Sequence, residues 1–325
     1  MKLISHPILC NYYLTYRCNA TCSFCDIWEK PSPFVKLENV EKNLSDLKKL
    51  GVKVIDFTGG EPLLHPQLAD FLEIAKQKKF ITTVTTNGIR YPKLANKLKG
   101  KVDMLHFSLD AADAETHDTM RGVKCFDKIM ESIEIAKNLG ERPDILCTVF
   151  EGNFEEIEKI YETITLKNRL VLILNPVFEY NSVDTLGNLN KNYLEKLVKF
   201  SKKKLVYLNE AFIHLRLEGG NKVEKPVCRA ASSRIVISPK NKLVLPCYHL
   251  GKEEFEIHDN LYDLYHSDKV KKIIQQEGKL KECEGCVINC YMQPSFAVEI
   301  NRFFWKALPS TLKYNFIKGT WKNLL

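Results

Sequence analysis

The sequence has no long apolar run. No segment approaches the roughly 18 apolar residues that a membrane-spanning helix needs, and His6 and Pro7 interrupt the N-terminal stretch that a secretory signal would use. Hydrophobic residues make up 45% and charged residues 27% of the 325 positions, which is typical of a globular protein with a substantial core. We therefore expect a cytoplasmic protein.

Histidine pairs at metal-ligand spacing are also missing, and no residue stands out as an acid or base. The sequence does contain eleven cysteines. In a cytoplasmic chain of this size, clustered cysteines are better explained as metal ligands than as disulfides, which indicates a reducing setting. Cys10, Cys125 and Cys147 lie in predicted strands or helices and are expected to be small buried residues instead.

The formal charge of +8 raises the question of a nucleic acid or anionic lipid partner. Most lysines, such as those at 76–79 and 202–204, lie on amphipathic helical stretches, where a solvated helix face explains them. No nucleic-acid partner is therefore expected.

The first cysteine group consists of Cys18, Cys22 and Cys25, at the spacing C-x-x-x-C-x-x-C. Three thiolates so spaced can hold three irons of a 4Fe-4S cluster and leave the fourth iron open. An open iron can bind a small molecule, whereas a cluster that only carries electrons is usually closed by four cysteines. Taken alone, the triplet is also compatible with a zinc knuckle.

A second motif, Thr-Gly-Gly-Glu-Pro-Leu at 58–63, follows the triplet. Together the two motifs resemble the radical S-adenosylmethionine (SAM) superfamily. The resemblance implies that the cysteines lie in a loop after the first barrel strand and that the open iron takes the amino and carboxylate groups of SAM. It also implies that a segment after the second strand binds the SAM amino group, namely Gly59, Gly60, Glu61 and Pro62. Phe24 stands where the family places an aromatic residue against the adenine.

Strand and helix patterns alternate along the chain. We expect strands at 8–15, 52–57, 80–85, 102–109, 145–149 and 170–174, and helices at 37–50, 66–79, 91–98, 126–139, 154–165 and 191–203. Strict alternation predicts parallel strands joined by right-handed crossovers, so the fold class is α/β, an open partial (β/α)6 barrel of the TIM type. In such barrels the chemistry gathers at the C-terminal ends of the strands.

Polar residues follow the third and fourth predicted strands. Asn87 belongs to a Thr-Thr-Asn-Gly segment, and Ser108 and Asp110 belong to Ser-Leu-Asp-Ala, which is followed by His-Asp-x-x-Arg-Gly containing Arg121. Ordinary turns and helix caps would also explain these residues. The fourth-strand pattern resembles radical SAM enzymes that carry an additional cluster domain. The resemblance implies that Ser108 and Asp110 lie near the SAM ribose and that Arg121 binds the carboxylate of SAM. Asn153 is a less specific match.

Cysteines return after about residue 206, where the alternation ends. Residues 235–247 predict a β-hairpin that brings Cys228 and Cys247 to the same end, and a helical stretch at 261–276 leads to Cys283, Cys286 and Cys290. This part resembles the SPASM domain and its shorter Twitch variant, which carry auxiliary iron-sulfur clusters. A full SPASM domain has enough cysteines for two clusters, so the five here imply one auxiliary 4Fe-4S cluster.

The Twitch pattern would select Cys228, Cys247, Cys283 and Cys286, with Cys290 as a spare or as a replacement for Cys228. The hairpin glycine usual in that family is missing, since a lysine stands near its place. A structural zinc site is the alternative. We expect a radical SAM core at 1–205, an auxiliary cluster domain at 206–300 and a C-terminal tail at 301–325.

This tail contains no acidic residue and mixes aromatic with basic side chains, namely Phe303, Phe304, Trp305, Tyr314, Phe316 and Trp321 with Arg302, Lys306, Lys313, Lys318 and Lys322. Such a mixture suits the interface of an anionic membrane, which would place the protein peripherally at the inner membrane face. The alternative is that the tail packs its aromatic residues on the barrel and leaves its lysines in water.

The resemblance implies an enzyme. An external one-electron donor of the flavodoxin or ferredoxin type would reduce the first cluster, which would cleave SAM to methionine and a 5′-deoxyadenosyl radical that removes a hydrogen atom from an unidentified substrate. A small-molecule, sugar or lipid-linked substrate is slightly favoured, because the first strand begins within ten residues, where many SPASM relatives have a peptide-recognition domain.

Two other functions remain open. One is a maturase that modifies a ribosomal peptide, because a recognition domain can be a separate chain. The other is a non-catalytic iron-sulfur or zinc-binding partner protein, against which the intact triplet, Glu61 and Arg121 argue.

Overall fold

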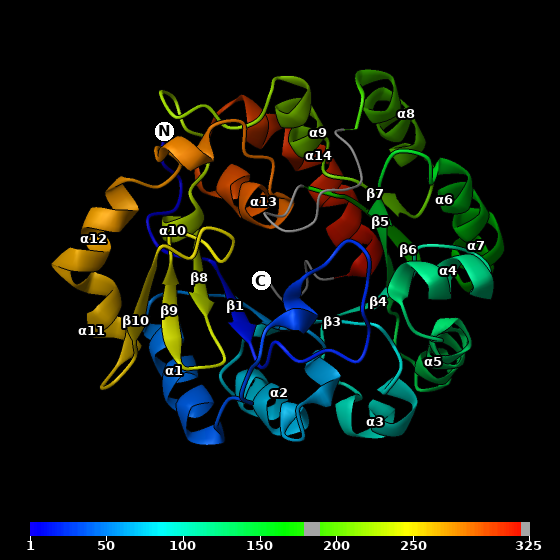
Figure 1. The fold of residues 1–325 in the computed structure, drawn as a ribbon, viewed down its shortest axis with the longest axis horizontal. Coiled ribbons are helices and arrows are strands. Elements are labelled where there is room, and N and C mark those ends of the chain that lie inside the picture. The colour runs from blue at the N-terminus through cyan, green and yellow to red at the C-terminus, as the bar shows by residue number, and fades with distance from the viewer. Residues whose placement is uncertain (179–188, 320–325) are drawn as a thin grey trace.

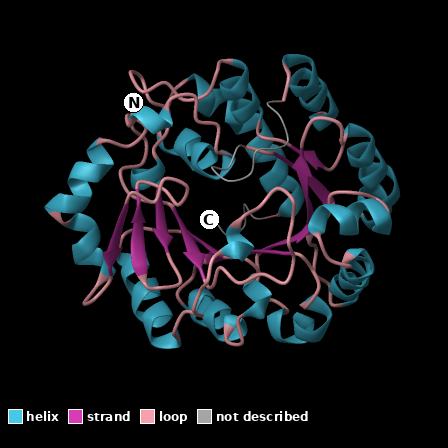
Figure 2. Cartoon of the chain, viewed as in Figure 1, coloured by secondary structure: helices cyan, strands magenta, loops and turns pink. Residues whose placement is uncertain are grey.

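The computed structural model describes residues 1–178 and 189–319. One curved sheet of ten strands, in the order β10-β9-β8-β1-β2-β3-β4-β5-β6-β7, organises the chain (Figure 1). Figure 2 shows helices along the outer, convex side of the sheet. Among the described strands, the sheet does not close on itself. This arrangement confirms the predicted α/β class and the partial barrel.

Seven neighbouring strands of the barrel run parallel. They are β1 (Leu9–Tyr13), β2 (Val54–Thr58), β3 (Ile81–Thr86), β4 (Met104–Ser108), β5 (Asp144–Val149), β6 (Val171–Pro176) and the short β7 (Val206–Tyr207). The crossover helices include α1 (Leu37–Lys49), α2 (Leu68–Gln77), α3 (Tyr91–Leu98), α5 (Phe126–Asn138), α6 (Phe154–Ile160) and α8 (Lys191–Ser201). The six predicted strands and their helices are all present, with boundaries shifted by a few residues.

Two helical regions differ from the predicted pattern. The segment with the His-Asp-x-x-Arg-Gly motif forms a short helix, α4 (Ala114–Arg121), which the side chain of Asp113 caps by accepting from Thr116 N and which Gly122 ends at φ +64°. The single helix predicted at 261–276 is two helices, α11 (Leu261–His266) and α12 (Asp268–Gln275). Ser267 between them is extended, so its backbone interrupts the helix.

The predicted hairpin forms from β8 (Arg234–Ile237) and β9 (Lys242–Leu245), and β10 (Glu253–Glu256) adds a further antiparallel strand. β8 also pairs in parallel with β1, so the hairpin continues the barrel sheet. This pairing covers the edge of β1, whose backbone N–H and C=O groups would otherwise be exposed. The predicted boundary near residue 205 therefore falls within one continuous sheet, and the domain division remains a prediction.

Helices α9 (Glu210–Leu217), α13 (Asn289–Val298) and α14 (Arg302–Lys318) lie between the two edges of the sheet (Figure 1). The short α10 (Ala230–Ser233) packs against α13, and α14 contacts α9, α13 and β7. These contacts form a second layer that covers part of the open side of the barrel. Within the described residues, no helix combines the length and apolar character needed to cross a membrane.

The predicted tail is mainly the helix α14. Phe303 is buried, the ammonium group of Lys313 donates to three backbone carbonyls, and Lys318 pairs with Asp144 of β5 at 3.0 Å. Other residues of the same helix are exposed, namely Trp305, Leu312 and Phe316. Two of the residues that suggested a membrane contact, Trp321 and Lys322, lie outside the described residues.

Candidate functional site

The loop that carries Cys18, Cys22 and Cys25 follows β1 directly. Its backbone is attached to the end of α4, because Thr21 N donates to Arg121 O at 3.0 Å and Ser23 N donates to Met120 O at 3.2 Å. Within the loop, Cys25 N donates to Cys22 O at 3.2 Å. The loop is therefore held by the segment that contains the His-Asp-x-x-Arg-Gly motif.

The three thiols of this loop are partly exposed and lie close enough to influence one another. Burial, with a smaller contribution from the neighbouring thiols, raises the pKa of Cys18 to about 12 and that of Cys25 to about 11. Thiols must lose their protons to bind iron, and the positive charge of a metal centre favours that loss. The three cysteines thus fit a cluster held on one side by protein and open on the other.

The glycine pair of the second motif allows the loop after β2 to lie against the loop after β1. Gly60 N donates to Thr15 O at 2.9 Å, and Glu61 N donates to Arg17 O at 2.9 Å. A Cβ atom would lie 2.1 Å from Thr15 O at Gly59 and 2.3 Å from Arg17 O at Gly60. Because neither distance leaves room for a side chain, both positions require glycine.

Glu61 is only 1% exposed, and its carboxylate is bound by neighbouring groups. It accepts hydrogen bonds from Leu63 N at 2.9 Å, Thr86 Oγ1 at 2.8 Å and Asn87 N at 2.8 Å. Burial raises the pKa of Glu61, and these hydrogen bonds oppose the shift. The side chain therefore joins the ends of β2 and β3. Pro62 follows it as the first residue of the 3-10 turn η2 (Pro62–Leu64).

Asn87 joins the third strand to the cysteine loop. Its Nδ2 donates to Asn19 Oδ1 at 2.8 Å, and its Oδ1 accepts from Ile89 N at 3.2 Å. Asn19 lies between Cys18 and Cys22, so this contact positions the loop. The role of Asn19 was not predicted, because no sequence motif indicates it.

Arg121, at the end of α4, lies beside the cysteine loop. Its Nη2 pairs with Asp110 Oδ2 at 2.5 Å, its Nη1 lies 3.7 Å from Cys22 Sγ, and its Cζ lies 5.2 Å from the ring centroid of Phe24. Burial works against the charged form, but Asp110 and Cys22 together raise the pKa of Arg121 above its usual value. Its Nε has no hydrogen-bond partner in the part of the chain that the structure describes. The guanidinium of Arg121, with its Nε available as a donor, thus lies at the predicted SAM site.

The other polar residues predicted for this site are buried around it. Asp110 Oδ1 accepts from Thr148 N at 2.8 Å, and Ser108 is buried at the end of β4. Asn153 donates from Nδ2 to Thr148 O at 2.8 Å, and its Oδ1 accepts from Tyr193 Oη at 3.1 Å. These contacts of Asn153 stabilise the turn after β5, and its role towards a cofactor remains a prediction.

His117, Asp118 and Cys125 also lie together, with potential ligand atoms within 4.8 Å of one another. Asp118 Oδ1 accepts from Cys125 N and Phe126 N, both at 2.9 Å. His117 Nδ1 accepts from Asp110 N at 3.2 Å. These hydrogen bonds connect α4, α5 and β4, so a structural role explains the group. Cys125 is buried, as predicted, and so are Cys10 and Cys147.

The five late cysteines gather around Cys286. Burial, with a smaller contribution from Cys286, raises the pKa of Cys247 to about 12 and that of Cys290 to about 11. Cys228 is likewise influenced by Cys286, which is itself influenced by Cys283. This arrangement fits one cluster and supplies one thiol more than four-cysteine ligation needs.

Asn221 organises the late cysteines and was missed by the sequence analysis. Its Nδ2 donates to Gly278 O at 2.8 Å and Cys283 O at 3.1 Å, and its Oδ1 accepts from Cys228 N at 3.1 Å. A buried amide with donors and acceptors on both sides can fix two loops at once. A lone Asn in a loop gives no sequence signal for this role.

A second missed group lies between the first strands of the barrel. Asn11 of β1 donates from Nδ2 to Asp56 Oδ2 of β2 at 2.6 Å, and Arg234 of β8 donates from Nη1 to Asn11 Oδ1 at 2.5 Å. Strands buried on both faces usually read as continuous apolar runs. Asn11 and Asp56 are polar residues within two of the predicted strands, and this departure from an apolar run was the signal that could have identified the group.

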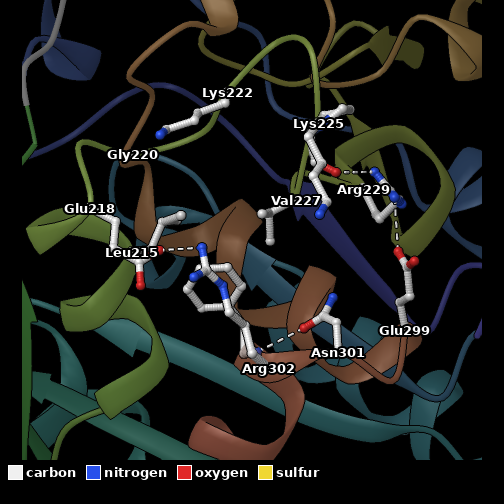
Figure 3. A pocket seen from close by; sticks show the side chains of 12 residues that line it. Leu215, Glu218, Gly220, Lys222, Lys225, Val227, Arg229, Glu299, Asn301 and Arg302 are labelled. Carbon is white, nitrogen blue, oxygen red and sulfur yellow. Dashed lines mark hydrogen bonds and ion pairs between the residues drawn. The ribbon is translucent and has the colours of Figure 1, made fainter.

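A cavity of about 520 Å³ lies between α9, residues 220–229 and the junction of α13 and α14 (Figure 3). Arg229 pairs there with Glu299 at 2.8 Å and Arg302 pairs with Glu218 at 2.5 Å, so these cations are neutralised. None of the described residues that line this cavity belongs to the predicted site. The cavity therefore gives no support for a second active site.

Residues 12–164 match the radical SAM superfamily. The chain is 27% identical over 289 residues to the antilisterial bacteriocin subtilosin biosynthesis protein AlbA of Bacillus subtilis, covering 84% of this chain and 62% of AlbA. It is 30% identical over 202 residues to a probable GTP 3′,8-cyclase of Thermoplasma volcanium, covering 59% of this chain and 60% of that protein. The chain thus spans less than two thirds of the length of both relatives.

Two solved structures share the fold. Streptococcus suis SuiB bound to S-adenosylmethionine matches with a TM-score of 0.67 at 17% identity, over 82% of this chain and 67% of SuiB. Native anSMEcpe with bound AdoMet matches with a TM-score of 0.66 at 18% identity, over 98% of this chain and all of that chain (100%).

Proposed function

Because residues 12–164 of this chain match the radical SAM superfamily, we propose that Cys18, Cys22 and Cys25 hold a 4Fe-4S cluster with an open iron that binds SAM. When bound, the cluster and SAM supply reductive cleavage to methionine and a 5′-deoxyadenosyl radical, which takes a hydrogen atom from a substrate inside the barrel. The observation that carries this proposal is the convergence of the cysteine loop, the paired glycines and Arg121 at one end of the barrel.

The surrounding residues act by binding and positioning. Arg121 binds the SAM carboxylate through its free Nε edge, Phe24 lies against the adenine, and Ser108 with Asp110 lies near the ribose. The backbone of the Gly-Gly-Glu-Pro segment binds the SAM amino group, because the Glu61 carboxylate is already occupied. Asn87 fixes the cysteine loop, and Asn153 fixes the turn after β5.

The late cysteines are proposed to hold one auxiliary 4Fe-4S cluster. Four of them match the Twitch pattern, Cys228, Cys247, Cys283 and Cys286, and the position of Cys290 beside Cys247 and Cys286 makes it the alternative ligand. An external flavodoxin or ferredoxin is the proposed electron donor. Four-cysteine ligation would suit electron transfer, whereas an open iron would suit direct substrate binding.

The substrate is proposed to be a small molecule, a sugar or a lipid-linked compound. A peptide is the second candidate, because the likeness to AlbA, named for bacteriocin biosynthesis, covers 84% of this chain, and because SuiB has been solved bound to its precursor peptide SuiA. A membrane contact through α14 would rest on Trp305, Leu312 and Phe316, which share one exposed helix face. Four basic side chains of this helix have protein partners instead, namely Arg302, Lys306, Lys313 and Lys318.

Iron content tests the cluster assignment. Anaerobically reconstituted protein should hold about eight irons per chain, the number in two cubane clusters. Replacing Cys18, Cys22 and Cys25 with alanine should leave about half of that iron and abolish the spectral change on adding SAM. The matched control is Cys147→Ala, a buried cysteine on β5 outside both groups, which should keep the full iron content. Zinc in place of the residual iron would contradict the auxiliary cluster.

A further inference from the structure

One buried cation inside the sheet lacks a complete set of partners. Arg234, the first residue of β8, is 5% exposed, and its Nη1 donates to Asn11 Oδ1 at 2.5 Å. Its Nε is buried and has no hydrogen-bond partner among residues 1–178 and 189–319. Leaving a buried guanidinium donor unpaired is costly, so a buried arginine is normally paired with an anion.

The neighbours of Arg234 only partly compensate its charge. Asp56 is joined to it through Asn11, whose Nδ2 donates to Asp56 Oδ2 at 2.6 Å. Burial raises the pKa of Asp56, although Arg234 and the hydrogen bonds from Asn11 and Thr83 oppose the shift. The ring of Tyr291 lies 5.0 Å from Arg234 Cζ, and a cation–π contact is weaker than a buried ion pair.

Arg234 contacts one element that leads into the first cysteine group and one that carries a late cysteine. Its partner Asn11 is on β1, which leads into the loop of Cys18. Tyr291 is on α13, next to Cys290, and the charge of Arg234 acts on the Cys290 thiol. A ligand that reaches the free edge of the guanidinium would therefore lie beside Tyr291 and near Cys290 of the proposed auxiliary cluster.

We propose that Arg234 binds an anionic group of the substrate, a carboxylate or a phosphate. This inference rests on the proposed function, because the substrate of hydrogen abstraction would bring the anion into the barrel. The planar guanidinium offers adjacent donors that match two oxygens of either group. Asn11 holds the opposite side of the guanidinium and so positions its free edge. Arg234 is thus a specificity-determining residue for an acidic substrate.

Thermal unfolding of the anaerobically reconstituted protein tests the proposal with simple anions as probes. Sodium phosphate and sodium acetate are each compared with sodium chloride at equal ionic strength, because a ligand that binds only the folded state raises Tm. The wild type is compared with Arg234→Gln, Arg234→Lys and the control Arg90→Gln. Arg90 is exposed at the start of α3, and its side chain makes no capping hydrogen bond.

Phosphate or acetate should raise Tm above the chloride value in the wild type and in Arg90→Gln. The Arg234→Gln variant should lose this increment, since loss of a charge-assisted bidentate contact weakens binding by about ten- to a hundredfold. Arg234→Lys should keep a reduced increment, and it replaces Arg234→Gln if the latter fails to fold. General salting effects cancel between variants. The anion that acts identifies the substrate group as a phosphate or a carboxylate.

An equal increment in Arg234→Gln and the wild type, or no increment in the wild type, would overturn the anion site. The proposed function is tested separately by 5′-deoxyadenosine formation in the same wild-type preparation without substrate. Absence of that product together with an Arg234-dependent increment would contradict the radical chemistry and leave the anion site established. Formation of 5′-deoxyadenosine without the Arg234-dependent rise in Tm would support the radical chemistry and contradict the anion site.

Discussion

At the scale of single residues, the predicted site residues divide into two groups. Phe24 in the cysteine loop and Arg121 beside it have groups available for a ligand, whereas Glu61 and Asn153 use their polar atoms within the protein. Sequence motifs identify both kinds of residue without separating them. To tell the two groups apart, one must know the hydrogen-bond partners of each side chain, and these partners lie on strands and turns that are distant in the sequence.

Arg121→Lys tests the proposed SAM contact. Lysine keeps the positive charge but loses the planar fork, so SAM affinity should fall by about ten- to a hundredfold while the iron content stays unchanged. Equilibrium binding of SAM to the reconstituted protein measures the change. The matched control Arg90→Lys, at an exposed position, should bind SAM as the wild type does. An unaltered affinity in Arg121→Lys would show that another group holds the carboxylate.

His117 should make stability depend on pH. Burial, followed by Arg121, lowers the pKa of His117 to about 4, and its Nδ1 must stay unprotonated to accept from Asp110 N. The folded-state pKa lies below the unfolded value, so the unfolded chain binds the proton first and stability falls as pH drops below about 6.5. Between pH 7 and pH 5 this contribution should decrease by about 2 kcal/mol.

Urea unfolding of the metal-free protein at both pH values, in the wild type and in His117→Asn, measures this contribution. The asparagine variant lacks the titrating ring, so its stability should change less with pH than that of the wild type. If the two proteins lose the same free energy between pH 7 and pH 5, His117 is not the titrating group.

At the scale of elements, α14 illustrates why composition alone left two interpretations open. Its aromatic and basic residues suited a membrane surface as well as packing on the barrel. In the structure, Phe303 packs inward and Lys318 pairs with Asp144, while Phe316 is 78% exposed. Local pattern could not assign these faces, because the partners lie on β5, more than a hundred residues away in the sequence.

The pair of Lys318 and Asp144 should contribute to the attachment of α14. Both side chains are almost fully buried, and Tyr314 Oη also donates to Asp144 Oδ2 at 2.6 Å. Lys318→Met would leave a buried carboxylate with fewer partners, which should cost about 3 kcal/mol in the free energy of unfolding. The control Lys271→Met, on the exposed side of α12, should change stability by about 0.5 kcal/mol or less.

Urea titrations of the three proteins give the comparison. A loss in Lys318→Met no greater than that in Lys271→Met would indicate that α14 is held by its apolar contacts alone. The comparison is informative because both substitutions remove one ammonium group from a helix.

At the scale of the whole molecule, the alternation of strand and helix was sufficient to predict the barrel, because each βα unit has its own local pattern. The continuation of the sheet through β8 was not predicted, since the pairing of Leu9 with Arg234 joins residues far apart in sequence. The same pairing explains why Arg234 went unnoticed. A charged residue at the start of a hairpin strand looks solvent-exposed until the strand is placed beside β1.

The molecule as a whole is proposed to bring two cysteine groups and a buried cation to one barrel. An anaerobic assay of 5′-deoxyadenosine, formed from SAM and a strong reductant, tests directly whether the loop of Cys18, Cys22 and Cys25 holds a cluster that cleaves SAM. The reconstituted wild type and Cys147→Ala should form the product, and the variant lacking Cys18, Cys22 and Cys25 should form none while keeping its auxiliary iron. No product from a wild type with a full iron content, or undiminished product from the variant, would contradict SAM cleavage at these three cysteines.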